Sequence, residues 1–127
     1  IHSADGRGQT VLCRAARHGH VLVVRWLVQK GANIHARDED GRDAMLLAAE
    51  HGFFEVARFL VQEEAQKNRW NDFGETALMF AAQHGDIDFV RLLIESGVHL
   101  NLLDNNETSA TMRAAEFGHR EVFLELA

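Results

Sequence analysis

The segment Gly74-Glu75-Thr76-Ala77-Leu78-Met79-Phe80-Ala81-Ala82-Gln83-His84-Gly85 decides the fold, because its features recur along the chain at one spacing. When the sequence is laid over itself with a shift of 33 residues, its alanine pair falls on Ala15-Ala16, Ala48-Ala49 and Ala114-Ala115. A glycine stands four positions after the first alanine of each pair, at Gly19, Gly52, Gly85 and Gly118. Four copies in one register indicate a repeat protein.

Each repeat reads as a pair of helices. A residue that can accept a hydrogen bond from the first turn of a helix precedes every first helix, at Thr10, Asp43, Thr76 and Ser109. The alanine pair allows close helix packing, and the glycine ends the helix after about two turns. A second helix follows, over 21–28 in the first repeat, where Val23 and Leu27 share one face.

The connection between repeats reads as a closed turn. Gly31 and Gly97 follow the second helices of two repeats and can adopt the left-handed conformation that ends a helix. Tight polar turns then occupy 38–41 and 71–74. Helix pairs this short cannot cover their own apolar faces, so we expect the repeats to stack with a continuous core.

The quoted segment resembles the signature of the ankyrin-repeat family, Gly-x-Thr-Pro-Leu-His-x-Ala-Ala-x-x-Gly. Residues 27–34 resemble its closing stretch, Leu-Leu-x-x-Gly-Ala-Asp-Val, and the resemblance extends from about Asp5 to the end of the chain. It implies an all-α ankyrin-repeat solenoid of helix-turn-helix-loop units with right-angled, β-hairpin-like turns. We expect about four repeats, at approximately 5–37, 38–70, 71–103 and 104–127, within a single domain 1–127.

The chain departs from the family pattern near the end of its second repeat. Glu64 stands where Gly31 and Gly97 stand, and a glutamate resists the left-handed conformation. The second helix of this repeat either runs on through Ala65 or ends differently, so its boundary within 63–66 is not fixed by the sequence.

The resemblance implies that a partner protein binds a concave surface made of loop tips and first helices. On this surface we expect contacts from the positions that vary between repeats. These are Arg7, Arg17, His18, Glu39, Asp40, Arg42, Glu50, His51, Trp70, Asp72, Phe73, Glu75, Gln83, His84, Asn105, Asn106 and Phe117.

Two aromatic residues stand at a turn that is normally polar. Trp70 and Phe73 are either exposed anchors for a partner or side chains that cover each other and the irregularity near Glu64. Both interpretations stay open at this stage.

Histidine recurs at one position, in His18, His51 and His84. Equivalent residues of stacked helices lie about 8–10 Å apart, too far to share one metal ion, so we expect no metal. His35, Asn68 and Asn101 share another column, at a loop position that an oxygenase can hydroxylate in the family. They are candidate hydroxylation positions, with hydrogen bonding inside the loop as the alternative.

Composition narrows the class of partner. The net charge of -6 repels nucleic acid and anionic membranes, and 46% hydrophobic with 25% charged residues is ordinary for a folded domain. Cys13 is the single cysteine, which favours a reducing, intracellular setting in the cytoplasm or nucleus. We expect a monomeric domain without cofactor, nucleic-acid or membrane partners.

The sequence contains no catalytic motif, so the favoured function is a protein-interaction module and not an enzyme. Two alternatives stay open. The repeats could form a regulatory or substrate-recruiting arm of a larger enzyme or channel, or a small inhibitor resembling the ankyrin inhibitors of cyclin-dependent kinases.

Overall fold

The computed structural model describes residues 10–63 and 65–127, which contain eight α-helices. The chain forms two compact units, residues 1–66 and 67–127. Arg7, one of the expected contact residues, lies outside the described residues.

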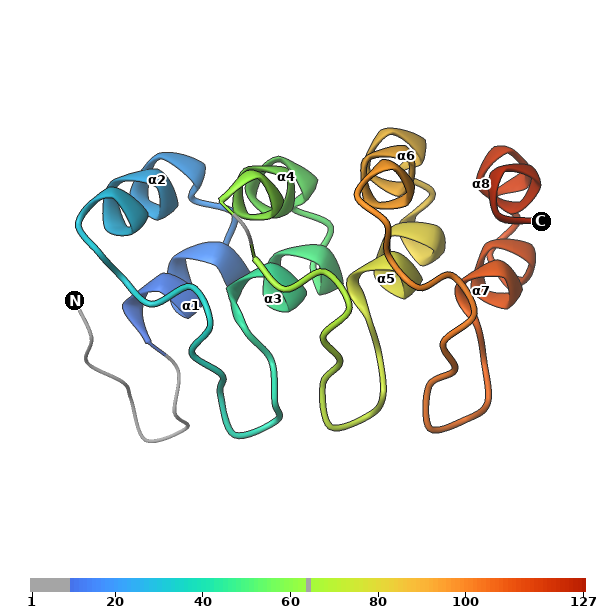
Figure 1. The fold of residues 1–127 in the computed structure, drawn as a ribbon, viewed down its shortest axis with the longest axis horizontal. Helices are drawn as coiled ribbons and strands as arrows, with labels where there is room; N and C mark the ends of the chain where they lie inside the picture. The colour runs from blue at the N-terminus through green and yellow to red at the C-terminus, as the bar shows by residue number, and fades with distance from the viewer. Residues whose placement is uncertain (1–9, 64) are drawn as a thin grey trace. The chain divides into compact units, whose positions relative to one another are not determined.

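Unit 1 contains two helix pairs. They are α1 (Val11–Arg17) with α2 (Val21–Gln29), and α3 (Ala44–Glu50) with α4 (Phe54–Gln62). The first helices α1 and α3 pack side by side in one layer, and the second helices α2 and α4 form the other layer (Figure 1).

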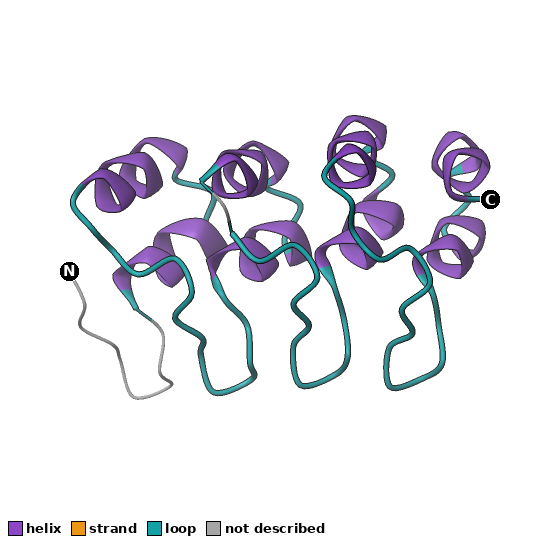
Figure 2. Ribbon diagram, in the orientation of Figure 1, coloured by secondary structure: helices purple, strands orange, loops and turns teal. Residues whose placement is uncertain are grey.

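Unit 2 repeats this arrangement. Its pairs are α5 (Ala77–His84) with α6 (Ile87–Glu95), and α7 (Ala110–Glu116) with α8 (Arg120–Leu126). Here α5 packs on α7, and α6 packs on α8. In both units the connecting loop projects beyond the layer of first helices, as Figure 2 shows.

The residues expected to start the first helices do so. The side chains of Thr10, Asp43, Thr76 and Ser109 accept hydrogen bonds from the amides of Cys13, Leu46, Met79 and Met112. These bonds satisfy amides that a helix leaves free at its start. The glycine after each first helix has a positive φ, as at Gly85 with 76°. Both features of the repeat are therefore confirmed.

The second helix of the second repeat ends at Gln62, so the alternative in which it runs on through Ala65 is wrong. The amide of Ala65 donates to the Leu60 carbonyl at 2.9 Å, and the amide of Ala32 donates to Leu27 at 3.0 Å. The same closing hydrogen bond therefore forms in the repeat that lacks the glycine.

The projecting loops share a hairpin-like turn. In each turn between residues 10 and 127, an Asp or Asn accepts backbone amides two and four residues on, as Asp104 does from Asn106 and Thr108 at 2.8 and 2.9 Å. Asp38 and Asn71 do the same in their own turns. Trp70 and Thr76 form an antiparallel bridge across one turn, in agreement with the expected hairpin character.

The core consists of the repeated apolar columns. Leu12, Met45 and Leu78 on the first helices are at most 3% exposed, and Leu27, Leu60 and Leu93 on the second helices are equally buried. Val23 differs from its counterparts, because it is 47% exposed while Val56 and Val122 are 1% exposed.

Candidate partner-binding surface

In unit 1, Arg42 contacts two other expected contact residues, Asp40 and Glu50. Its guanidinium lies 3.2 Å from Asp40 and 3.2 Å from Glu50, and its Nε donates to Asp38 Oδ2 at 3.0 Å. Partial burial works to lower the pKa of Arg42, but the carboxylates of Asp38 and Glu50 outweigh it and raise the pKa. Arg42 is therefore a fixed cation between a loop tip and the first helix α3.

His51 extends this cluster. Its Nε2 lies 3.4 Å from Glu50. Burial lowers the pKa of His51, and the positive charges of Arg17 and Arg42 add to this effect against the opposing Glu50. His51 is thus held in its neutral form near pH 7. Among the residues that the structure describes, no group of histidine, cysteine and carboxylate side chains could hold a metal ion.

In unit 2, Arg113 organises the corresponding surface from helix α7. Its Nη2 lies 2.7 Å from both Glu75 and Asp104, and its Nη1 donates to Gln83 at 3.0 Å. Its guanidinium also lies over the Phe80 ring, 5.6 Å from the centroid. Arg113 thereby joins both loops of unit 2, helix α5 and helix α7 through one buried side chain.

The charges of this network depend on each other. Burial alone would raise the pKa of Asp104, but hydrogen bonds from Arg113, Thr108 and Asn106 lower it below its usual value. Burial likewise opposes the charge of Arg113, and the hydrogen bonds to Asp104 and Glu75 raise its pKa. Both groups are therefore ionised at neutral pH.

A polar groove of about 290 Å³ lies above this network. Its lining residues come from the first helices and loops of unit 2. We call this site the polar groove, and it is lined by Glu75, Gln83, Asp104, Asn106, Thr108, Arg113, Glu116 and Phe117. Phe117 is 50% exposed at its edge. The groove therefore combines fixed hydrogen-bonding groups with one exposed aromatic ring.

A second, more apolar hollow of about 190 Å³ lies between the two loops of unit 2. We call its lining residues the loop groove: Trp70, Gly74, Thr76, Leu102, Leu103 and Asn105. Trp70 is 56% exposed, Phe73 at the neighbouring tip is 57% exposed, and Leu103 is 53% exposed. Trp70 and Phe73 thus present more than half of their surfaces to solvent.

The two loops of unit 2 are tied together by an expected contact residue. Asn105 donates from its amide nitrogen to the Phe73 carbonyl at 2.9 Å and from its side chain to the Asp72 carbonyl at 3.0 Å. These bonds fix the tips relative to each other. Three expected contact residues, His18, Glu39 and His84, are exposed.

The candidate hydroxylation positions lie on the loops. His35 and Asn101 are exposed, whereas Asn68 is partly buried and its Oδ1 accepts the His99 amide at 2.8 Å. This hydrogen bond joins the loop of Asn68 to the following loop, and the three positions stay candidates for hydroxylation.

The sequence reasoning missed Arg113, Asp104 and Leu103. Arg113 stands in the column of Leu47 and Phe80, which are buried core residues. The column also contains Arg14, which is exposed, so the column alone did not show that Arg113 is a buried charge that needs partners. Leu103 shares the column of Trp70, so the apolar pair could have been found by comparing repeats.

Equal helix pairs joined by projecting loops, with exposed aromatic side chains beside two grooves, define a helical repeat protein with a surface suited to binding. A family model of ankyrin repeats in many copies matches residues 12–61, and one of ankyrin repeats in three copies matches residues 65–127. The chain therefore belongs to the ankyrin-repeat family. Ankyrin repeats are in general non-catalytic modules through which proteins bind other proteins.

No curated protein matches the chain. None of the helices in the described part of the chain is both long and apolar enough to cross a membrane.

Proposed function

We propose that this chain is a protein-interaction module that binds a partner protein through its loop tips and the exposed sides of its first helices, and that it catalyses no reaction. The observation that carries the proposal is a set of four large apolar side chains in unit 2, each at least half exposed, beside the two grooves: Trp70, Phe73, Leu103 and Phe117.

Burial of these side chains would supply the binding energy. Large aromatic residues dominate the energetics of protein interfaces, because each buries a large area with few rotatable bonds. A single exposed apolar residue is common on protein surfaces, but several around one groove indicate a site of contact. Trp70 and Leu103 share the loop groove, which would receive an apolar side chain of the partner.

The polar residues beside these apolar side chains are already held in place by hydrogen bonds and ion pairs within the chain. Arg113 holds Glu75 and Gln83, and Arg42 holds Glu50 in unit 1. Side chains that are ordered before binding lose little conformational entropy when the partner arrives. These networks therefore support specificity, since a partner must match groups whose positions it cannot rearrange.

A capture experiment with matched variants tests the proposal. Trp70→Ala combined with Phe73→Ala should abolish capture of the proteins that the parent chain retains from a cell extract. Both residues are more than half exposed, so the helical circular dichroism and the unfolding midpoint should stay unchanged.

The control is Leu22→Ala on α2. Leu22 is 75% exposed and lies on a second helix, away from the proposed surface. This variant should retain the same proteins as the parent. If the double variant captures an unchanged set of proteins, the two aromatic anchors do not serve the interaction and the proposal is wrong in its central part.

A further inference from the structure

The second helices show which residues face the preceding repeat. Val56 on α4 and Val122 on α8 are each 1% exposed, and within its unit each of these helices has a second helix before it and none after it. This column therefore packs toward the preceding repeat. The equivalent Val23 on α2 is 47% exposed.

Val11 repeats this pattern on the first helices. It is 44% exposed, while the equivalent Ala44 in unit 1 and Ala110 in unit 2 are 1% exposed. We call the exposed residues of the first repeat the leading face: Val11, His20, Val23 and Trp26. Val11 and Val23 have counterparts that are buried between repeats, whereas Phe53, in the column of His20, is 38% exposed.

The opposite side of a repeat is marked by its second alanine. Ala16 on α1 and Ala82 on α5 are fully buried, and each has a following first helix in its own unit. The equivalent Ala115 on α7 is exposed. This column therefore packs toward the following repeat, and Ala115 lies where such a repeat would pack.

The glycines that end the first helices identify what would cover Ala115. A Cβ atom on Gly19 would meet the Phe53 ring at 2.5 Å, and one on Gly85 would meet the His119 ring. Phe53 and His119 both precede the second helix of the following repeat. A Cβ atom on Gly118 would have nothing within 4 Å. The ring of a further residue can therefore pack on Gly118 as the Phe53 ring packs on Gly19.

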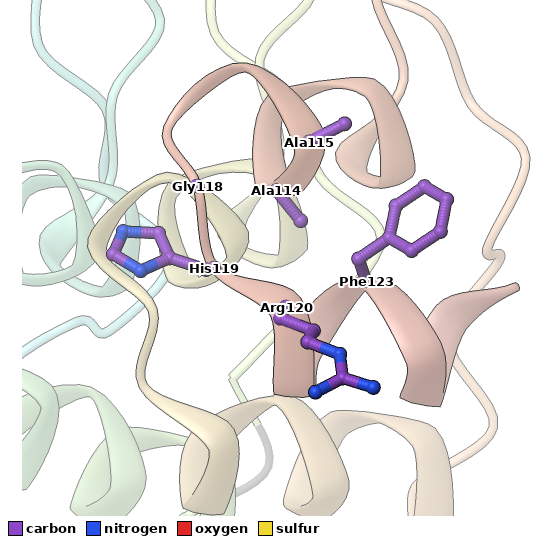
Figure 3. A pocket seen from close by; sticks show the side chains of 6 residues that line it. All are labelled: Ala114, Ala115, Gly118, His119, Arg120 and Phe123. Carbon is purple, nitrogen blue, oxygen red and sulfur yellow. The ribbon is translucent and has the colours of Figure 1, made fainter.

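Gly118 lies in an apolar hollow of about 260 Å³. Figure 3 shows Ala115 and Phe123 around this hollow, with the His119 ring on the side away from Phe123. We call the exposed residues here the trailing face: Ala115, Gly118, Phe123 and Leu124. Leu124 is 59% exposed.

One contact between second helices recurs at a spacing of 34 residues. The Arg25 guanidinium lies over the Phe59 ring at 5.2 Å, and Arg91 Nε donates to Glu125 at 2.9 Å. In the last repeat the position of Arg25 and Arg91 is taken by Leu124. In the first repeat the position of Phe59 and Glu125 is taken by Trp26, which is 53% exposed.

We propose that copies of this chain associate head to tail, with the leading face of one copy on the trailing face of the next. His20, in the column of Phe53 and His119, would lie on Gly118, and Trp26 would pack against Leu124. The contact continues the interface that already joins repeats within each unit. Leu124 is apolar at the position where preceding repeats carry Arg25 and Arg91, and Arg120 lines the edge of the hollow beside Gly118. Such an interface is heterologous, so further copies can add at either end.

The oligomeric state of the whole chain tests this proposal. Sedimentation equilibrium over about 1 µM to 1 mM, a range that brackets weak to moderate association, should give a mass that rises with concentration above the 14.3 kDa monomer. A mass of 14.3 kDa at every concentration would overturn the proposal and assign the two faces to another occupant, such as a further helix pair.

Two substitutions block one face each. Val23→Glu places a charge on the leading face, and Ala115→Arg fills the trailing face. Each variant alone should stay monomeric. A mixture of the two should form a 1:1 dimer and nothing larger, because the mixture retains one intact leading face and one intact trailing face. Association that survives Ala115→Arg, or a mixture that stays monomeric, would overturn the head-to-tail arrangement.

Leu22→Glu is the matched control, because it places the same charge one residue away on α2. The equivalent positions already carry acids at Glu55, Asp88 and Glu121, and all of these are exposed. This variant should associate as the parent does. If Val23→Glu loses its helical circular dichroism, Trp26→Glu replaces it, since Glu125 occupies that column in a folded repeat.

Discussion

Arg42 and Arg113 each hold several polar partners, but they reach them from different parts of the repeat. Arg42 lies in a loop and keeps 19% of its side chain exposed, whereas Arg113 lies on a first helix and keeps 8% exposed. A buried charge requires partners that replace its water, so the geometry around Arg113 is more restrictive. The carboxylate of Asp104, 5% exposed, is the partner most dependent on it.

Acid should therefore weaken unit 2 through Asp104. Its pKa is lowered in the folded state, so its ionised form contributes stability above the usual carboxylate pKa, and this contribution is lost as the pH falls through the folded value. Asp104→Asn should be less stable than the parent at neutral pH, and the difference should shrink between about pH 5 and pH 3. Urea unfolding at several pH values measures both effects.

The asparagine variant is expected to keep the turn. Asn71 accepts the amides of Phe73 and Glu75 with its Oδ1 in the preceding loop, and the same geometry is open to an asparagine at 104. A stability difference that stays constant from neutral to acid pH would show that the Asp104 charge does not stabilise the fold.

In one turn of the projecting loops, a residue with a side chain has the left-handed backbone conformation that favours glycine. Gly41 and Gly74 have φ values of 74° and 76°, and Glu107 takes the same place with φ 61°. A side chain in this region costs about 1–2 kcal/mol, part of which a glycine returns through its flexible unfolded state. Glu107→Gly should therefore stabilise the protein by about 0.5–1 kcal/mol, measured by urea unfolding.

The reverse substitution serves as the control for this turn. Gly74→Ala should destabilise the protein, because φ is 76° and the added Cβ would meet Asn105 Oδ1 at 2.8 Å. Equal stability of Glu107→Gly and the parent would mean that the strain of the turn is relieved elsewhere.

The helices and turns were predictable because each has a local chemical signal that recurs. Thr76 starts a helix and Gly85 ends one wherever their counterparts occur. The end of α4 was not predictable, since the signal of glycine is absent at Glu64. The helix ends in place through the bond from Ala65 to Leu60, which depends on the backbone and not on a residue type.

The candidate surface was predictable in position but not in its energetics. The variable columns identified Glu75 and Gln83, yet the residue that fixes them, Arg113, shares its column with two buried apolar residues and was missed. Its role depends on partners 30 and 38 residues away in sequence, and no local pattern records such a contact. The exposure of Trp70 and Phe73 likewise follows from how the loops pack.

At the scale of the whole molecule, an experiment can show whether the chain unfolds as one cooperative domain or as two separate units. The sequence predicts a single domain, and the structure forms two compact units, 1–66 and 67–127. In repeat proteins each repeat contacts its neighbours, so stability is a sum of local terms, and a local defect can unfold part of the array. Native-state hydrogen exchange separates partial from global unfolding, because it reports each region separately.

Arg113→Leu provides the local defect. Leucine is compatible with this column, where Leu47 and Phe80 are buried, but the substitution leaves Asp104 and Glu75 without their cation. Breaking a buried ion pair costs about 3 kcal/mol, so amide exchange in α5, α7 and α8 should become faster by about two orders of magnitude. Exchange in α1 to α4 should keep its parent rate if the units unfold separately.

Arg91→Leu serves as the control, because Arg91 is exposed and its partner Glu125 is also solvated. This variant should leave amide exchange in α5 and α7 nearly unchanged. Faster exchange in all helices after Arg113→Leu would instead show one cooperative domain, as the sequence predicts. Exchange unchanged in α7 would show that the buried network of Arg113 does not stabilise the fold.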